Sequence, residues 1–158
     1  MHSNKKVSCV WSDLRRHWRA SKRQRLLLCE ALVSLAIARI AMVCIPFRRI
    51  AAWLGTPGAQ TPTTSTDRET RVARQIGWAV STLGPRVPWD ARCLAQALAA
   101  TFMLRRRAIN GTVSFGVTHD QSGKLIAHAW LRCGSVLVTG GPGHHQFKTL
   151  TTFSRDRS

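Results

Sequence analysis

The sequence contains few acidic residues. Seven Asp and Glu stand against 24 Lys and Arg, which gives the 158-residue chain a formal net charge of +17. Such an excess attracts acidic partners, such as nucleic acid, anionic lipid or an acidic peptide, and charge alone does not choose between them. The basic residues are mostly single arginines or short runs, and no nucleic-acid-binding motif or aromatic-studded basic repeat accompanies them. We therefore expect no nucleic-acid partner.

The cysteines lack the spacing of a disulfide framework or a zinc site. None forms a C-x-x-C pair, and their number is odd: Cys9, Cys29, Cys44, Cys93 and Cys133. A chain of this length can bury about two-thirds of its unfolded surface, so it does not need disulfides to fold. A Gly-rich loop that could cradle phosphates is also absent. We therefore expect a reducing, cytoplasmic location and neither a metal nor another cofactor.

The first third of the chain lacks glycine. Between Trp11 and Trp53 there is no Gly, and Pro46 is the one proline. Ser12 can cap a helix that starts just after Trp11. The sequence therefore predicts a helical N-terminal segment over residues 1–55.

Within that segment the stretch 26–47 is strongly apolar and long enough to cross a membrane. Glu30 and Arg39 argue against a span, because an ionised side chain near mid-bilayer costs about 2.5–3.5 kcal/mol. Pro46 would also interrupt the helix. We expect helices packed on the domain or on a partner, with association to a membrane surface as the alternative.

A short stretch rich in Thr and Pro, residues 56–66, follows and is predicted to be a linker. The remainder, residues 67–158, is the predicted core domain. Its first helix is expected from about 68 to 83, with Asp67 as its cap and Gly84 at its end.

The next predicted helix carries a cysteine near its start. Strong helix formers run from Leu94 to about Arg107. If Asp90 is the N-cap, Cys93 is the third helical position. The unpaired backbone N–H groups and the helix dipole there favour a thiolate, which is the reactive form of cysteine.

After Asn110-Gly111 the apolar pattern changes from a helical to an extended one. Strands are predicted over residues 112–117, 125–132 and 135–139. His128 lies on the second of these, on the same face as Trp130, because strand side chains alternate.

A cysteine at a helix start and a histidine on a later strand can supply the nucleophile and base of acyl transfer. Each also has a simpler explanation, since a cysteine in an Ala/Leu-rich helix is often a small core residue. A histidine on a strand is likewise often a packed polar group. Two classes are therefore open at this point: a cysteine-dependent enzyme, and a non-catalytic basic binding protein.

The residues around the pair resemble a known family. The blocks that carry the resemblance are Pro-Trp (88–89), Cys-Leu-Ala-Gln-Ala-Leu-Ala (93–99), Met-Leu-Arg-Arg-Arg (103–107), Phe-Gly-Val (115–117) and Ala-His-Ala-Trp-Leu (127–131). In this order and spacing they are similar to the transglutaminase-like maturation peptidase of lasso-peptide biosynthesis. More loosely, the apolar stretch followed by Arg48-Arg49 resembles the arginine-flanked helix of that family.

The resemblance implies an α+β fold. In it a papain- or transglutaminase-like core carries the nucleophile on a central helix packed on a small antiparallel sheet, after a helical N-terminal segment. Cys93 would attack a peptide carbonyl, and His128 would accept the thiol proton and later serve the leaving amine. The substrate would be a ribosomally made precursor peptide, cut between leader and core without a cofactor. An acyltransferase or amidase on the same fold is the alternative, because fold and dyad do not fix the acceptor.

The third catalytic member departs from the family pattern. An acidic residue commonly lies on the strand after the histidine, and the register gives that place to Thr139. A threonine hydroxyl can orient an imidazole but cannot stabilise its cation as a carboxylate does. Asp90 is the other candidate, although an N-cap role explains it equally well. The choice between the two is open here.

The resemblance also implies partners. Leader recognition in the family is done by a small domain that adds the leader as a strand to a sheet edge, and such a module needs several strands of its own. No hairpin signal precedes Asn110-Gly111, so we expect a separate leader-recognition protein. A separate ATP-dependent lasso cyclase would close the freed core peptide into a ring. The basic N-terminal helices are available to dock on the partner protein or on a lipid surface.

Overall fold

The computed structural model describes residues 21–155, and Ser12, the predicted first cap, lies outside this range. The described chain is an α+β fold, as the sequence predicted. Its helices are α2 (Lys22–Cys44), α3 (Phe47–Leu54), α4 (Asp67–Leu83) and α5 (Cys93–Arg105), with 3₁₀ turns η1 (Gly84–Arg86) and η2 (Pro142–Gln146). Its strands are β1 (Thr56–Pro57), β2 (Thr112–His119), β3 (Leu125–Cys133), β4 (Val136–Thr139) and β5 (Lys148–Ser154).

The strands form one antiparallel sheet in the order β1-β5-β2-β3-β4. The sequence predicted β2, β3 and β4 but neither β1 nor β5. Thr and Ser dominate β5, where Leu150 and Phe153 are the large apolar side chains, so its own hydrophobic pattern is weak. Hydrogen bonding to β2 on one side and to β1 on the other holds β5 in the sheet, although its composition does not predict a strand.

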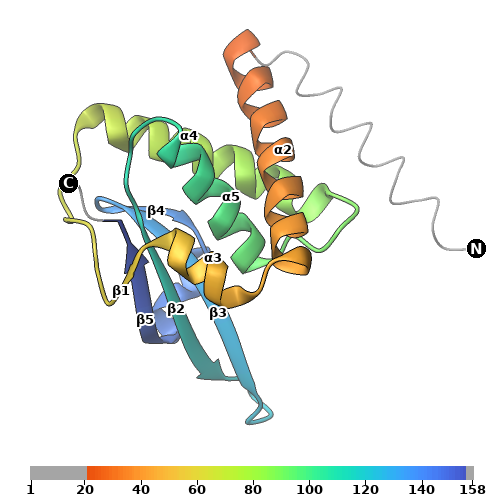
Figure 1. Ribbon diagram of the computed structural model, residues 1–158, viewed down its shortest axis with the longest axis vertical. Coiled ribbons are helices and arrows are strands. Elements are labelled where there is room, and N and C mark those ends of the chain that lie inside the picture. Colours follow the sequence, from red (N-terminus) through yellow and green to blue (C-terminus); the bar gives the residue numbers. More distant parts are fainter. Residues whose placement is uncertain (1–20, 156–158) are drawn as a thin grey trace, which may run out of the picture.

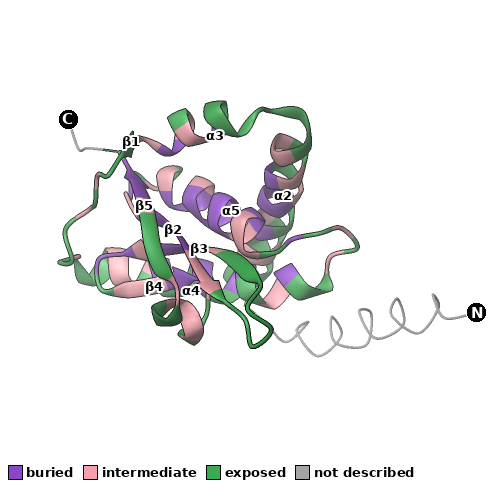
Figure 2. Cartoon of the chain, turned by 90° about the horizontal axis from the view of Figure 1, so that it is seen from below, coloured by how far each residue is buried: buried purple, intermediate pink, exposed green. Residues whose placement is uncertain are grey.

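The helices are layered on the sheet. Helices α4 and α5 pack against β3 and β4, and α2 packs outside them, on α4 and α5 (Figure 1). Helix α3 contacts β5. Buried residues gather on α5 and on the strands beneath it (Figure 2), so α5 is the centre of the core.

Two helices begin with a capping box. The Ser21 hydroxyl accepts the Gln24 backbone N–H and the Gln24 side chain accepts the Ser21 N–H, which starts α2. Thr66 and Glu69 make the same exchange at the start of α4. The N-cap of α4 is therefore Thr66, and the predicted cap, Asp67, is the first helical residue.

The N-terminal segment is helical, as predicted, but it is broken once. Ile45 has an extended backbone (φ −115°, ψ 128°), because the residue before a proline is disfavoured in the helical region. Pro46 then serves as the N-cap of α3. The break turns the chain from α2 into a second, short helix.

The start of α5 differs from the expectation. The N-cap is Arg92, without a side-chain cap, so Cys93 is the first helical residue and not the third. The Asp90 carboxylate accepts two hydrogen bonds from the Arg92 guanidinium, each 2.9 Å long. It is engaged there and does not cap the helix, so the predicted N-cap role of Asp90 is wrong.

The Thr/Pro stretch is tied to the sheet. Its first residues form β1, and the Thr61 backbone N–H donates to the Thr112 hydroxyl over 2.8 Å. Arg132 donates to the Thr61 carbonyl over 3.0 Å. These contacts hold the stretch against the core, and its role as a linker between 1–55 and 67–158 stays a prediction.

One ion pair joins the outer helix to the central one. Glu30 of α2 accepts two hydrogen bonds from Arg107, just beyond the end of α5, at 2.8 and 2.6 Å. Arg106 lies 3.8 Å from the same carboxylate. The inner face of α2, with Ala31 and Leu35, is fully buried beside this pair. A charge-assisted pair therefore fixes the position of α2 on α5.

A second arginine joins α5 to α3. The Arg105 guanidinium donates to the last carbonyls of α3, those of Trp53 and Leu54, over 2.6 Å each. It also lies 4.2 Å from the centre of the Trp53 ring. Burial lowers the pKa of Arg105 to about 10, so it stays cationic at neutral pH.

We expect Glu30→Gln to lower the free energy of unfolding by about 2 kcal/mol, because it leaves the half-buried Arg107 without its anion. The measurement is urea unfolding at pH 7. Asp90→Asn is the matched control, since it removes the carboxylate of an exposed ion pair and is expected to have a much smaller effect. Equal losses in the two variants would contradict the structural role of Glu30.

The same pair predicts a pH dependence. The hydrogen bonds from Arg107 hold the pKa of Glu30 below its ordinary value of 4.5, against the opposing effect of burial. A lowered folded-state pKa stabilises the fold above the ordinary value, and this contribution is lost as the pH falls through the lowered one. The difference between wild type and Glu30→Gln is therefore expected to be full at pH 7 and to shrink below about pH 4.

Candidate active site

A cavity of about 680 Å³ lies along the β4 edge of the sheet. Its walls come from α4, η1, the start of α5, β3, β4 and the turn that follows β4. Cys93, His128 and Thr139, three of the four residues singled out in the sequence, line it together. Asp90 is not among the lining residues. The fold therefore brings the predicted nucleophile and the predicted base to one cavity.

One face of α4 forms a wall that the sequence analysis did not assign to the site. The residues on it are Arg74, Gly77, Trp78 and Ser81, at the spacing of a single helix face. Gly77 allows α4 to approach β4, because a Cβ there would lie 2.6 Å from the Val138 carbonyl oxygen. Gly77 stands inside an otherwise helical sequence pattern, and such a glycine could have indicated a close packing contact of this helix.

Cys93 is the first residue of α5 and is partly exposed. The first N–H groups of a helix have no partner within the helix, so the thiol lies at its positive end. One turn later, Gln96 donates to the Ala91 carbonyl over 2.8 Å and ties the preceding loop to the helix. The pKa of Arg92 is raised, first by its hydrogen bonds to Asp90 and in smaller part by the charge of Cys93. A positive side chain therefore accompanies the thiol.

His128 and Trp130 share one face of β3, as predicted. Their rings stack at 6.0 Å, and the Phe147 ring lies 4.7 Å from the imidazole. The regular pairing of β3 with β2 places Leu131, which packs under the helices, on the opposite face. The imidazole is therefore held among aromatic rings on the face opposite Leu131, and it reaches the cavity at the open β4 edge of the sheet.

The hydrogen bond of His128 goes to the main chain. Its Nε2 lies 2.8 Å from the carbonyl oxygen of Gly140, which accepts in the tautomer that carries the hydrogen on Nε2. Gly140 has a φ of +110°, and a Cβ there would lie 2.3 Å from Cβ of Trp130. Only glycine fits this close to Trp130, and the backbone conformation of Gly140 brings its carbonyl oxygen to the imidazole.

The two candidates for a third member, Thr139 and Asp90, have other surroundings than the imidazole nitrogen. Thr139 pairs with Leu131 in the sheet, and its buried hydroxyl has no hydrogen-bond partner among the described residues. Asp90 is bound by Arg92. Within residues 21–155 neither side chain hydrogen bonds to His128, and their catalytic roles stay predictions. A backbone acceptor such as the Gly140 carbonyl leaves no mark in the sequence, which is why it was not foreseen.

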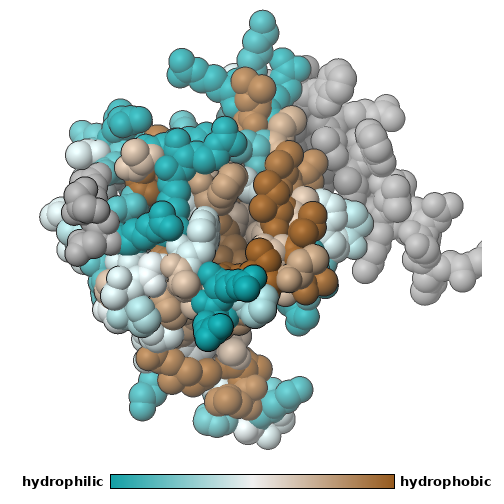
Figure 3. All heavy atoms as spheres, viewed as in Figure 1, coloured by the Kyte–Doolittle hydropathy of each residue, from teal (hydrophilic) through white to brown (hydrophobic). Residues whose placement is uncertain are grey.

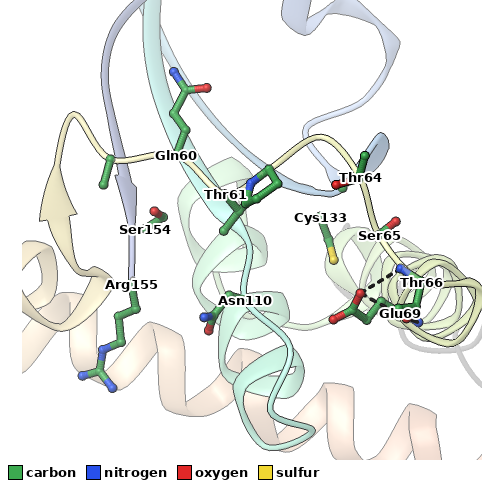
Figure 4. A pocket seen from close by; sticks show the side chains of 13 residues that line it. Gln60, Thr61, Thr64, Ser65, Thr66, Glu69, Asn110, Cys133, Ser154 and Arg155 are labelled. Atoms are coloured by element: carbon green, nitrogen blue, oxygen red, sulfur yellow. Dashed lines mark hydrogen bonds between the residues drawn. The ribbon is translucent and has the colours of Figure 1, made fainter. Parts of the chain in front are cut away.

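A second cavity, of about 660 Å³, lies beside the Thr/Pro stretch. Figure 4 shows hydroxyl side chains around it, with Glu69 bonded to Thr66 and with Cys133 at its side. Its described lining includes Cys133 but no histidine, so it offers no nucleophile and base together. Nowhere in the described part of the chain do three or more His, Cys, Asp or Glu side chains form a group that could hold a metal ion.

Comparison with known proteins gives a family. The model of the transglutaminase-like superfamily matches residues 41–152, which include Cys93, His128 and Thr139. No curated protein and no solved structure matches the chain. Proteins of this superfamily are usually cysteine-protease-like enzymes, which agrees with a cavity that joins a helix-start cysteine to a strand histidine. By this match over most of its length, the chain belongs to the transglutaminase-like superfamily.

Proposed function

We propose that the protein is a cysteine peptidase that removes the leader from a ribosomally synthesised lasso-peptide precursor. Cys93 is the nucleophile and His128 the base. The observation that carries the proposal is the single cavity lined by both side chains, one of them at a helix N-terminus. The resemblance of the blocks around them to the lasso maturation peptidases supplies the substrate class. The absence of a cofactor and a reducing, cytoplasmic location, which keeps the thiol free, belong to the same proposal.

The reaction proceeds in two steps. The Cys93 thiol gives its proton to His128, and the sulfur attacks the carbonyl carbon of the scissile peptide bond. The C–N bond breaks as the leaving amine takes the proton from His128, which leaves the leader as a thioester on Cys93. Water, deprotonated by His128, then hydrolyses the thioester and restores the thiol.

The Cys93 thiol makes no hydrogen bond to His128 within residues 21–155. Such bonds are often long in the free enzyme and tighten only when substrate is bound. The cavity that the two side chains share has a volume of about 680 Å³. Bound substrate therefore completes the dyad in this proposal.

In this proposal the Gly140 carbonyl orients His128. When it accepts the hydrogen on Nε2, the lone pair on Nδ1 is left to take the thiol proton. A carbonyl dipole stabilises an imidazolium less than a carboxylate does, but it fixes the tautomer and the ring in the same way. The dyad then needs neither Thr139 nor Asp90 as a side-chain partner.

We expect Cys93→Ala and His128→Ala each to abolish precursor cleavage and to leave the protein folded. Nucleophile and base act as a unit, so each loss can reach about six orders of magnitude in rate. The measurement is cleavage of a lasso precursor, with mass spectrometry to tell hydrolysis from transfer to an amine. A soluble Cys93→Ala protein that keeps most of the activity would end the peptidase hypothesis, and an amide product would favour the acyltransferase.

Gly140→Ala is expected to lower kcat roughly 100-fold, because the added methyl group collides with Trp130 and displaces the carbonyl from His128. Gly141→Ala is the matched control. It has the same kind of backbone strain, with a φ of +69°, but its methyl group meets open space. Thr139→Val and Asp90→Asn are expected to stay near the wild-type rate. If either of these lost activity by orders of magnitude while Gly140→Ala kept it, that side chain would be the third member.

The proposal includes two protein partners. An ATP-dependent lasso cyclase takes the freed core peptide, and a separate leader-recognition protein presents the precursor. The described residues before α5 form helices and the short β1, whose two residues pair with β5. That part of the chain offers no sheet of its own to which a leader could add as a strand.

We expect cleavage at low precursor concentration to require the leader-recognition protein. The measurement compares rates with and without that partner, at a precursor concentration well below the KM of the isolated chain. Full-speed cleavage by the isolated chain that still depends on the leader would show that its own helices read the leader. A leaderless peptide that carries the same scissile bond is the control for intrinsic activity.

A further inference from the structure

The outward side of α2 is an apolar surface. We call outer face the set of side chains exposed there by 45% to 71%: Leu26, Val33, Ile37, Ile40 and Val43. Hydrophobic side chains gather along α2 in the space-filling view (Figure 3). The opposite side of the same helix, with Leu35 and Ala38, is buried against the core.

A helix that is apolar all round is normally covered all round, by protein or by lipid. Helix α2 is apolar enough over its 23 residues to cross a membrane by length and composition. The described residues bury only 22% of its most apolar 18-residue window. Within residues 21–155 the outer face is therefore left uncovered.

Positive charge frames the outer face at both ends. Lys22, Arg23 and Arg25 lie in the first turn, and Arg48 and Arg49 follow the break at Pro46. The one acidic residue of α2, Glu30, is held by Arg107. Two copies of this face would bring like charges together, whereas anionic lipid headgroups would neutralise them.

An apolar groove continues the outer face. It has a volume of about 400 Å³ between α2, α3 and α5, and Arg49 is the one charged residue in its described lining. The other walls include Ile37, Trp53 and Phe102. Apolar walls beside a cation complement an anionic phospholipid, which has hydrocarbon chains beside a negative headgroup.

We propose that the outer face docks on an anionic lipid bilayer, with α2 in the plane of the surface. A transmembrane orientation is excluded in this proposal. It would pull Leu35 and Ala38 out of the core and would leave Arg107 without Glu30. Docking in the plane buries the outer face among acyl chains and places the flanking arginines at the headgroups.

The experiment is flotation of the full-length protein with vesicles of phosphatidylglycerol and phosphatidylcholine. Ile40→Gln is expected to weaken binding about 10-fold or more, because it removes a large apolar side chain from the buried surface. Leu150→Gln is the matched control, since Leu150 is 64% exposed against 62% for Ile40 but lies on β5. Its binding is expected to equal that of the wild type.

Charge is tested separately. Arg48→Gln is expected to weaken binding about fivefold, and neutral phosphatidylcholine vesicles are expected to bind far less protein than anionic ones. Cys93→Ala is expected to bind vesicles like the wild type. Vesicle binding is therefore tested independently of the proposed peptidase activity.

Three outcomes would overturn the proposal. Equal binding of the Ile40→Gln, Leu150→Gln and wild-type proteins would show that the outer face is not the docking surface. Absence of vesicle binding, with a dimer in sedimentation that Ile40→Gln dissociates, would assign the face to a second copy. Protection of α2 from a protease on both sides of the bilayer would show that the helix spans it.

Discussion

The shortness of the edge strand β4 determines where the candidate site can form. Strand β4 ends at Thr139, while β3 continues past it to His128 and beyond, so the edge of the sheet is open beside the imidazole. The chain leaves β4 through Gly140, whose positive φ turns its carbonyl onto Nε2 of His128. Helix α4 closes the other side of the opening, because Gly77 admits it to within backbone contact of β4. The open edge and the orientation of the histidine follow from that early end, and the wall of α4 follows from Gly77.

The sequence predicted the parts of this arrangement that depend on local pattern. Helix formers after Cys93 and alternation around His128 placed both residues on the correct elements, although the start of α5 was misplaced because Asp90 was read as a cap. The side chain of Asp90 had two uses open to it, and its neighbour Arg92 decides between them. The sequence pattern alone does not show whether Asp90 caps the helix or binds Arg92.

The parts that were missed depend on pairing and on backbone groups. Strand β5 is held by its neighbours on both sides, and its own Thr-rich pattern resembles a loop. The Gly140 carbonyl is the same chemical group at every residue, so only the fold distinguishes it as the acceptor for His128. A search of the sequence for an acidic third member looks for a side chain, and it cannot find an acceptor that the main chain supplies.

Helix α2 serves the fold with one side and leaves the other side free for a surface. Its inner side is fixed by burial of Leu35 and by the Glu30 pair with Arg107, so the outer face can bind another body without loosening the core. The cavity with Cys93 and His128 takes no lining residue from α2. A bilayer on the outer face would therefore leave the residues of that cavity unoccupied and available to a peptide. Five of the 24 basic residues, Lys22, Arg23, Arg25, Arg48 and Arg49, would then face the lipid headgroups from the two ends of one apolar helix.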